Sequence, residues 1–231
     1  AGHLTAVFET NFRRTLWTLD RDHDTHIQVK LDRGWIASNG RRDNISELEL
    51  QLVSGSIDSV YALALELAQR QALPPLLLSK AERGYRLFLN MPARPVKAGN
   101  VPIDAGDTPL AAFRLIALDC LSHLQLNHDG AVRSDDPEYV HQMRVAMRRL
   151  RAALRMFSPV LPAGFAEYLV PPMRELMRAL GQARDFDVLM AEIVVPVANA
   201  LPDEPRLTDL ASAITDRLYA ARANIRHVLQ Q

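Results

Sequence analysis

The chain has 231 residues, of which 48% are apolar, and its 27 Lys and Arg residues balance its 27 Asp and Glu residues. This length and apolar share allow one large domain or two ordinary ones with a buried core. The zero formal charge excludes a globally basic nucleic-acid binder and an acidic disordered tail. Cys120 is the single cysteine, no run approaches the roughly 18–20 apolar residues of a membrane span, and the chain opens without a signal segment. We therefore expect a cytoplasmic protein with no membrane partner.

The first part of the chain carries strand patterns. Residues 13–19 and 27–36 are rich in Val, Ile, Thr and Trp and flank the polar stretch 20–26, which predicts a hairpin turn. Residues 46–53 read SELELQLV, in which three leucines alternate strictly with Glu47, Glu49 and Gln51. A helical pattern follows over residues 57–72. These patterns predict antiparallel β structure with a helix.

The pattern changes across a proline-rich stretch. Between residues 90 and 109 the sequence NMPARPVKAGNVPIDAGDTP contains four prolines and two glycines, which prevent a helix and interrupt a strand. The helical patterns that follow cover residues 109–126, 137–157, 164–180, 184–200 and 205–229. Short connections favour antiparallel packing into a bundle. The sequence predicts an α+β chain with an α+β part over 1–90, a linker over 91–108 and an all-α bundle over 109–231.

Acidic and basic residues recur on the predicted strands. Glu47 and Glu49 are two residues apart, so both carboxylates project from one strand face, which is also what a solvated surface looks like. Further charged residues fall in or beside predicted strands: Lys30, Asp32, Arg13 or Arg14, Lys80 and Arg83. A sheet that closes on itself would gather these groups in a polar interior. Carboxylates suit a divalent cation, and the bases suit the oxygens of a polyphosphate chain.

Four runs in this region, in order, are FETNFRRTLW, VKLDRGWI, SELELQLVSG and LSKAERGYRLF. Together they resemble the C-terminal half of a CYTH domain, over roughly residues 5–88. CYTH domains have the triphosphate tunnel fold of inorganic triphosphatases, thiamine triphosphatases and class IV adenylate cyclases. The resemblance implies an antiparallel barrel that binds triphosphate with Mg²⁺ or Mn²⁺.

The resemblance also implies roles for single residues. Arg14, Lys80 and Arg83 would hold phosphate, with Arg13 as a substitute for Arg14. Glu47 and Glu49 would be the catalytic carboxylates and metal ligands, and Asp32 would be a further metal ligand. The ExExK strand with which the family begins is absent from these residues. We therefore expect a fragment with about half of the barrel, inactive alone and able to self-associate through its open strand edges.

A second basic pattern lies in the helical part, where residues 141–157 read HQMRVAMRRLRAALRMF. One stripe of this helix is apolar, and the stripe beside it comprises His141, Arg144, Arg148, Arg151 and Arg155. Like-charged neighbours three and four residues apart destabilise a helix by a few tenths of a kcal/mol per pair, which indicates an anionic ligand. The alternative is a basic face paired with acids of neighbouring helices. Nucleic acid is disfavoured because no aromatic stacking platform accompanies the arginines.

The run VHQMRVAMRRLRAALRMF followed by LGQARDFDVL resembles the signature of a CHAD domain (conserved histidine α-helical domain) over about residues 107–231. The resemblance implies two helical repeats around a basic channel that binds inorganic polyphosphate, of which only the first repeat is expected here. The five stripe residues would contact phosphate. Arg184 would join them, or would form an ion-pair cluster at a helix start with Asp185 and Asp187.

Both resemblances favour one function. They predict a fragment of a bacterial-type, metal-dependent inorganic triphosphatase whose parent hydrolyses triphosphate and whose helical domain binds polyphosphate, including at polyphosphate granules. The alternative is a non-catalytic module that binds polyphosphate or targets such granules.

Overall fold

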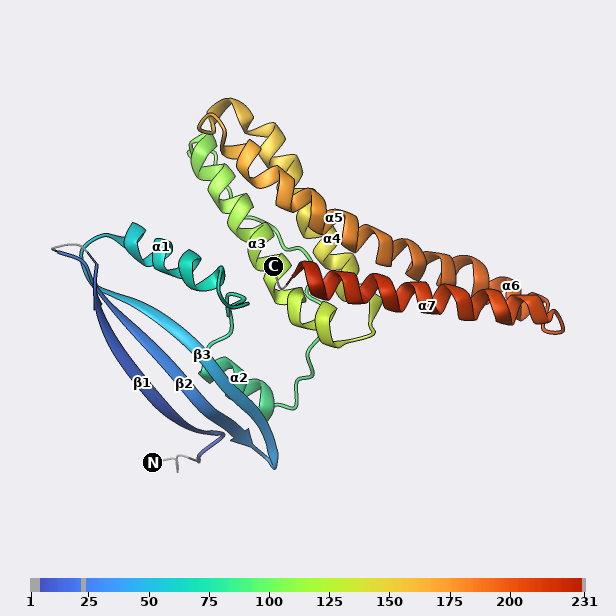
Figure 1. Cartoon of the computed structure of the whole chain (residues 1–231), viewed down its shortest axis with the longest axis horizontal. Helices are drawn as coiled ribbons and strands as arrows, with labels where there is room; N and C mark the ends of the chain where they lie inside the picture. The colour runs from blue at the N-terminus through green and yellow to red at the C-terminus, as the bar shows by residue number, and fades with distance from the viewer. Residues whose placement is uncertain (1–4, 22–23, 230–231) are drawn as a thin grey trace. The chain divides into compact units, whose positions relative to one another are not determined.

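The computed structural model describes residues 5–21 and 24–229 of the chain. Contacts within the chain divide it into two compact units, Ala1–Ala93 (unit 1) and Arg94–Gln231 (unit 2). Figure 1 shows strands with two helices in the first unit and helices alone in the second. Within the described ranges, no helix is long and apolar enough to cross a lipid bilayer.

Unit 1 is built on a three-stranded antiparallel sheet in the order β1-β2-β3 (Figure 1). The strands are β1 (Glu9–Asp20), β2 (His26–Ser38) and β3 (Arg41–Ser54). Asn39 and Gly40 join β2 to β3 with φ of 49° and 74°, the positive values that a tight two-residue hairpin turn requires. The turn predicted between β1 and β2 includes residues 22 and 23, which lie outside the described residues.

The two faces of this sheet differ in character. The register pairs Leu31 with Leu48 and Asp32 with Glu47, so that apolar and charged pairs alternate along β2 and β3. The leucine face packs under α1 (Ile57–Ala68), where Ile27, Val29 and Leu63 form a small buried core. The opposite face, which carries Glu47 and Glu49, is called the polar face below. The predicted alternation of residues 46–53 is confirmed.

The expectation that Lys80 and Arg83 lie in or beside strands is wrong, because they lie on the helix α2 (Lys80–Phe88). Ser79 begins this helix with a capping box, in which its side chain accepts a hydrogen bond from the backbone of Glu82 and the Glu82 side chain accepts one from the backbone of Ser79. The helix places Lys80 and Arg83 about one turn apart on one side.

Unit 2 consists of helices around one core. The four long helices are α3 (Pro109–Arg133), α4 (Pro137–Met156), α5 (Phe165–Leu189) and α7 (Pro205–Val228). Proline occupies the first turn of α3, α4 and α7, directly after a capping side chain. The core is buried between these helices, with Met143, Met147, Leu180 and Ile225 among its least exposed residues. The predicted α+β class with a helical second part is confirmed.

The predicted break between residues 180 and 184 is wrong. The helix α5 runs through these residues and continues into a π-helical turn, η2 (Met190–Val194), and then into α6 (Val195–Ala200). Gly181 does not end the helix. It is buried within α5, and a Cβ atom added there would lie 2.6 Å from Nη1 of Arg144 on α4. The glycine therefore allows a close approach between two helices.

The proline-rich stretch is attached to the bundle at Val96. The Val96 N–H donates to Oδ1 of Asn127 and its carbonyl accepts from Nδ2 of Asn127, both at 2.9 Å. The same carbonyl lies 2.9 Å from Nε2 of His123, and both of these α3 side chains are buried. The start of unit 2 is thus a backbone segment clamped against α3.

Candidate functional site

Asp32 is the centre of an ion-pair network on the polar face of unit 1. Its carboxylate is 1% exposed and accepts hydrogen bonds from Nε and Nη2 of Arg14 at 2.7 and 2.8 Å. Nζ of Lys80 lies 2.9 Å from Oδ2 of Asp32 and 2.6 Å from Oε2 of Glu47. The strand β1, the strand β2 and the helix α2 therefore meet at one buried carboxylate.

The network extends on either side of this centre. Arg83 pairs with Glu47 and, at 2.8 Å, with Asp43, while Lys30 lies 2.9 Å from Glu49. The structure thus brings together on one face all six residues predicted for the tunnel: Arg14, Asp32, Glu47, Glu49, Lys80 and Arg83. Asp43 was not predicted, although it lies four residues before Glu47 and hence on the same face of β3.

Arg13 does not substitute for Arg14. The register pairs Arg14 with Asp32 and Arg13 with Arg33, so the two neighbouring arginines project from opposite faces of the sheet. Arg14 and Lys80 also share an aromatic neighbour, because their cationic groups lie 5.6 and 5.3 Å from the ring centroid of Phe12.

The charges of the network shift the pKa values of its central members. Hydrogen bonds from Arg14, opposed by burial and assisted by Lys80, lower the pKa of Asp32 to about 2. Burial alone would lower the pKa of Lys80, but its bonds to Asp32 and Glu47 outweigh that effect and raise the pKa. Both groups are therefore charged throughout the neutral range.

The described residues do not form the metal site that the CYTH resemblance implies. Among them, no three His, Cys, Asp or Glu side chains come together as a metal ion would require. Both carboxylate oxygens of Asp32 are already bound by Arg14 and Lys80. Glu47 lies between Lys80 and Arg83, and Glu49 lies beside Lys30.

A second charged site lies on α4 of unit 2, where Arg144, Arg148, Arg151 and Arg155 form the arginine stripe. Arg144 is half-buried and the other three are exposed. Among the described residues, none of these four arginines takes part in an ion pair. Arg149, which lies outside the stripe, pairs with Asp119 of α3 at 2.8 Å. Pairing with neighbouring acids therefore does not account for the stripe.

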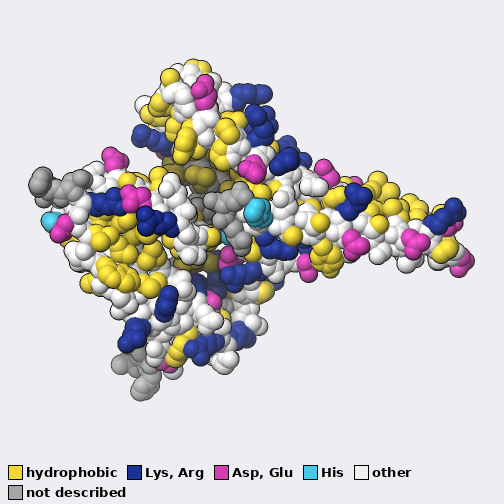
Figure 2. Space-filling view, viewed as in Figure 1, with side chains coloured by type: hydrophobic (Ala, Val, Ile, Leu, Met, Phe, Trp, Pro, Cys, Tyr) yellow, Lys and Arg dark blue, Asp and Glu magenta, His cyan; other side chains and the backbone are white. Residues whose placement is uncertain are grey.

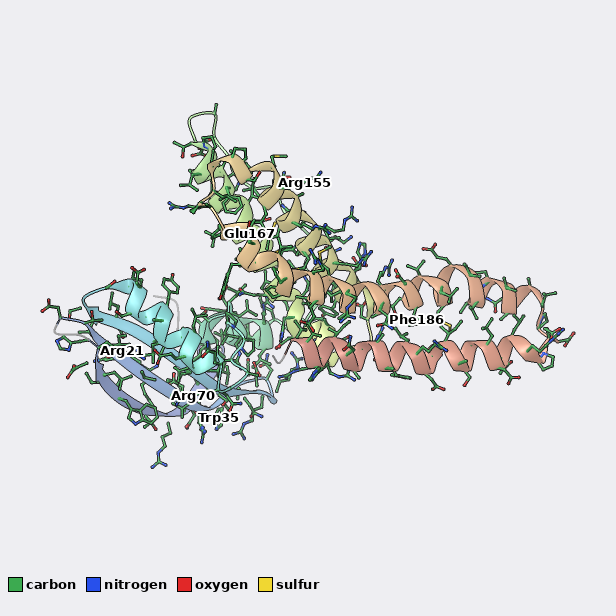
Figure 3. The ribbon with its side chains drawn as sticks, turned by 45° about the horizontal axis from the view of Figure 1, so that its top comes forward. Arg21, Trp35, Arg70, Arg155, Glu167 and Phe186 are labelled. Atoms are coloured by element: carbon green, nitrogen blue, oxygen red, sulfur yellow. The ribbon has the colours of Figure 1, made fainter. Side chains whose placement is uncertain are left out.

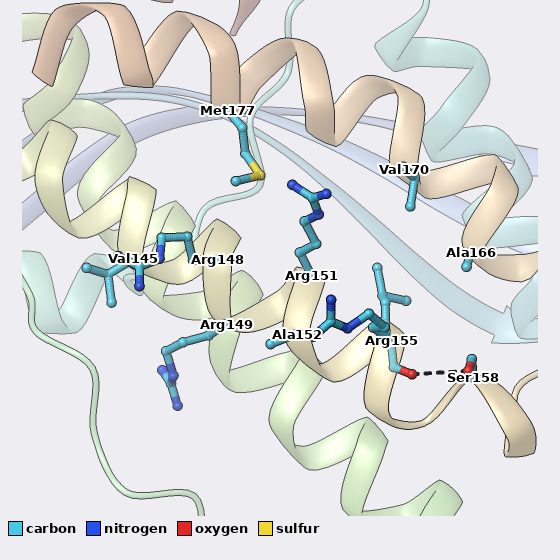
Figure 4. Close-up of a pocket in the computed structure, with 11 residues that line it drawn as sticks. Val145, Arg148, Arg149, Arg151, Ala152, Arg155, Ser158, Ala166, Val170 and Met177 are labelled. Atoms are coloured by element: carbon cyan, nitrogen blue, oxygen red, sulfur yellow. Dashed lines mark hydrogen bonds between the residues drawn. The ribbon is translucent and has the colours of Figure 1, made fainter. Parts of the chain in front are cut away.

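The arginine stripe borders a groove with a volume of about 910 Å³ between α4, the 3-10 turn η1 (Ser158–Val160) and α5. Its lining combines four arginines of α4 (Arg148, Arg149, Arg151 and Arg155) with apolar side chains of both helices. In Figure 4, Arg151 points toward α5, between Met177 and Val170, whereas Arg149 points the other way. Figure 3 shows Arg155 toward the end of α4. The groove is therefore apolar at its base and basic along α4.

The predicted cluster of Arg184, Asp185 and Asp187 lies within α5 and not at a helix start. The buried Asp187 pairs with Arg222 of α7 at 3.2 Å, and Arg222 in turn lies 2.9 Å from Asp135. Burial raises the pKa of Asp187, although Arg222 and Arg184 oppose the shift. Arg184 forms no ion pair with the described residues, and its contact with phosphate stays a prediction, as does that of the half-buried His141.

Comparisons with known proteins place part of the chain in a family. The CHAD domain family matches residues 115–231. The crystal structure of the CHAD domain from the plant Ricinus communis is 34% identical and superposes with a TM-score of 0.51 over 60% of this chain and 45% of that one.

Two curated relatives are matched over shorter stretches. An inorganic triphosphatase of Haemophilus influenzae is 32% identical over 84 residues, which are 36% of this chain and 24% of that protein. An uncharacterized protein of Mycobacterium tuberculosis is 39% identical over 61 residues, which are 26% of this chain and 12% of that protein. The chain thus spans at most about a quarter of the length of these relatives. Because the CHAD match takes in half of the sequence and the helical unit superposes on a solved CHAD structure, the chain belongs to the CHAD domain family.

Proposed function

We propose that unit 2 binds inorganic polyphosphate along the arginine stripe of α4. The observation that carries this proposal is that four arginines follow one another on one helix without an ionic partner among the described residues. Their mutual repulsion destabilises the helix, and an anionic ligand would relieve it. A guanidinium group offers a planar fork that matches two phosphate oxygens.

The groove beside the stripe favours a linear polyanion. Its apolar base excludes water from one side of the arginines, and an ion pair is stronger where the surroundings are less polar. The guanidinium groups recur along the helix and do not converge on one point, so successive phosphates of one chain would each meet an arginine. None of the described residues that line this groove is aromatic, so none could stack on a nucleobase.

The test reverses two charges of the stripe. In Arg148→Glu/Arg151→Glu, we expect the affinity for inorganic polyphosphate to fall by about a hundredfold and the dependence of log K on log salt to lose about two units. The matched control is Arg206→Glu/Arg217→Glu on α7, which changes the net charge equally at exposed residues and should change the affinity by no more than about twofold. Both measurements use titration calorimetry at several salt concentrations. Equal losses in the two variants would contradict the proposal, because net charge alone would then explain binding.

A second function, which the network in unit 1 favours, is the handling of a triphosphate on the polar face. We propose that Arg14, Lys80 and Arg83 hold phosphate oxygens there, and the similarity to a named inorganic triphosphatase supports this. Four bases (Arg14, Lys30, Lys80 and Arg83) face four acids (Asp32, Asp43, Glu47 and Glu49). A bound phosphate chain therefore has to replace carboxylates as the partners of these bases.

The predicted Mg²⁺ or Mn²⁺ belongs to this second function. The carboxylates of the polar face are of the right chemical kind, but each is engaged by Lys or Arg and they do not complete a metal site. The carboxylates Glu47 and Glu49 stay the proposed catalytic groups. A cytoplasmic location, including polyphosphate granules, belongs to the same proposal.

Lys80 provides the test of the second function. On the Arg148→Glu/Arg151→Glu background, Lys80→Gln should lower the affinity for tripolyphosphate by about tenfold, because one charged phosphate ligand is lost. Lys97→Gln removes an exposed lysine and should leave the affinity unchanged. If Lys80→Gln on this background also leaves it unchanged, while the chain with an intact arginine stripe binds polyphosphate, the protein is a non-catalytic polyphosphate-binding module.

A further inference from the structure

The leucine face of the sheet, opposite the polar face, carries a second group of basic residues beyond the Ile27, Val29 and Leu63 core that packs under α1. Arg13 of β1 and Arg33 of β2 lie directly opposite each other, and Arg42 of β3, which pairs with Ala37, lies four residues further along the same face. The guanidinium carbon of Arg42 lies 4.9 Å from the ring centroid of Trp35, which Figure 3 labels. These four residues are called the outer arginine face.

The outer arginine face is exposed and unpaired. Arg13, Arg33 and Arg42 are all exposed, and none of them takes part in an ion pair with a described residue. By strand alternation, the one acid on this face of the three described strands is Glu9, at the start of β1. Figure 2 shows Lys and Arg side chains gathered over the end of the sheet where β2 turns into β3.

This arrangement costs the sheet stability. Side chains of residues directly opposite in an antiparallel pair are close enough to interact, and like charges there repel. The polar face of the same sheet balances each base with an acid, so the absence of acids beside Arg13 and Arg33 is specific to the outer face. An anion lying across β1 and β2 would remove the repulsion.

The chemistry of the outer arginine face favours a chain of phosphates over other anions. The arginines lie on the surface of a sheet in two rows, which suits an extended ligand that meets them in succession. A single-stranded nucleic acid would also need a row of free aromatic surfaces for its bases, whereas Trp17 is the one exposed ring on this face of the described strands and Trp35 is half-buried with Arg42 against its ring.

We propose that the outer arginine face is a second binding site for inorganic polyphosphate, separate from the polar face and from the arginine stripe. Arg13 and Arg33 would bind neighbouring phosphates, and Arg42, held in place by Trp35, would bind the same chain further along. The site goes beyond the proposed function, because its residues belong neither to α4 nor to the ion-pair network.

The experiment uses the full chain with the Arg148→Glu/Arg151→Glu background, so that the arginine stripe is removed first. Adding Arg33→Glu should lower the remaining polyphosphate affinity by about tenfold or more. The same substitution should raise the unfolding temperature of unit 1, because the new carboxylate faces Arg13. Trp17 and Trp35, the two tryptophans of the chain, both lie in unit 1, so their fluorescence reports on this unit. A gain in stability with a loss of binding cannot come from misfolding.

The control Arg86→Glu changes the charge equally on α2, which lies on the other side of the sheet, and should leave the affinity within about twofold. An unchanged affinity in Arg33→Glu would overturn the proposal, as would a loss seen equally in the control or only in Lys80→Gln. Single-stranded RNA that binds as tightly as polyphosphate and depends on Arg33 would overturn the choice of ligand. Failure of the function proposed for unit 2 would be recognised separately, because the Arg148→Glu/Arg151→Glu variant without further substitutions would then keep its affinity for polyphosphate.

Discussion

At the scale of single residues, Asp32 decides how unit 1 presents its bases. The buried carboxylate holds Arg14 from β1 and Lys80 from α2 at hydrogen-bonding distance, and these two cations come from elements distant in sequence. A shift of this carboxylate would therefore move both cations. Asp32 thus holds the bases of the polar face in place, and both of its carboxylate oxygens contact them.

The low pKa of Asp32 gives unit 1 a defined dependence on pH. A carboxyl whose pKa falls from 3.8 unfolded to about 2 folded stabilises the fold by about 2 kcal/mol above pH 4, and this stability is lost as the pH falls toward 2. We expect Asp32→Asn to destabilise unit 1 by about that amount at pH 7 and to have no effect near pH 2. Urea unfolding followed by tryptophan fluorescence measures the difference.

The control for this prediction is Asp43→Asn, which removes a carboxylate that is 43% exposed from the same network. It should cost less than about 1 kcal/mol at either pH. Equal stability of Asp32→Asn and the unchanged chain at pH 7 would contradict the prediction. Water would then stabilise the charged groups of Arg14 and Lys80 as well as the Asp32 carboxylate does.

Strand alternation made the membership of this network predictable, but not the role of Asp32. Residues two apart on a strand share a face, so Glu47 and Glu49 could be grouped from the sequence alone, whereas Asp32 joins them through the register of β2 with β3. Lys80 could be grouped with them only through a resemblance, since it lies on a helix whose orientation depends on tertiary packing. The sequence did not show that both oxygens of Asp32 are contacted by Arg14 and Lys80, and the assignment of Asp32 as a metal ligand stays a prediction.

At the scale of elements, Gly181 of α5 leaves the space that the guanidinium group of Arg144 on α4 occupies. The guanidinium group of Arg144 lies where a side chain at position 181 would begin. The two motifs of the helical unit are thus joined in space, since one supplies the arginine and the other supplies the glycine beside it. This contact sets the direction in which the first arginine of the stripe points.

The substitution Gly181→Ala should separate stability from binding. Alanine favours a helix interior over glycine by about 1 kcal/mol, and the obstructing group is the flexible end of Arg144, so the free energy of unfolding should not fall. The displaced guanidinium should lower the affinity for polyphosphate by about threefold to tenfold. Thermal unfolding by circular dichroism and calorimetric titration measure the two effects.

Gly130 offers the contrasting case for this prediction. A Cβ atom there would overlap the ring of Tyr139, which is buried and cannot swing away, so Gly130→Ala should destabilise unit 2 by about 1–3 kcal/mol. If Gly181→Ala loses stability as Gly130→Ala does, the space beside Arg144 is needed for the packing of α4 against α5, and the prediction that it serves to orient the arginine stripe is wrong.

The same glycine explains an error in the predicted elements. Glycine after an apolar helical run is a common helix end, and the sequence therefore predicted two helices where α5 is one. The sequence pattern cannot distinguish a glycine that ends a helix from one that admits a neighbouring side chain. Conversely, Ser79 and Glu82 form a capping box, a sequence pattern that indicates the start of α2.

At the scale of the whole molecule, a formal charge of zero conceals three different arrangements of charge. Acids and bases alternate on the polar face, whereas the arginine stripe and the outer arginine face lack paired acids among the described residues. Composition alone did not predict the division into a sheet unit and a helical unit, which required the motifs and the hydrophobic patterns of the sequence. It could not predict where the unpaired cations lie, because pairing depends on contacts between elements distant in sequence.

The clamp at Val96 determines where a separately produced helical unit has to begin. A version that starts at the first helix would leave the buried amide of Asn127 and the ring of His123 without the backbone groups that they now bind. His123 would keep Gln142 and the Asn127 N–H would keep the carbonyl of His123, so the loss falls on Oδ1 of Asn127, and a buried polar group without a partner costs about 1–3 kcal/mol. The segment before α3 is therefore part of the packed helical unit, although its sequence resembles a spacer.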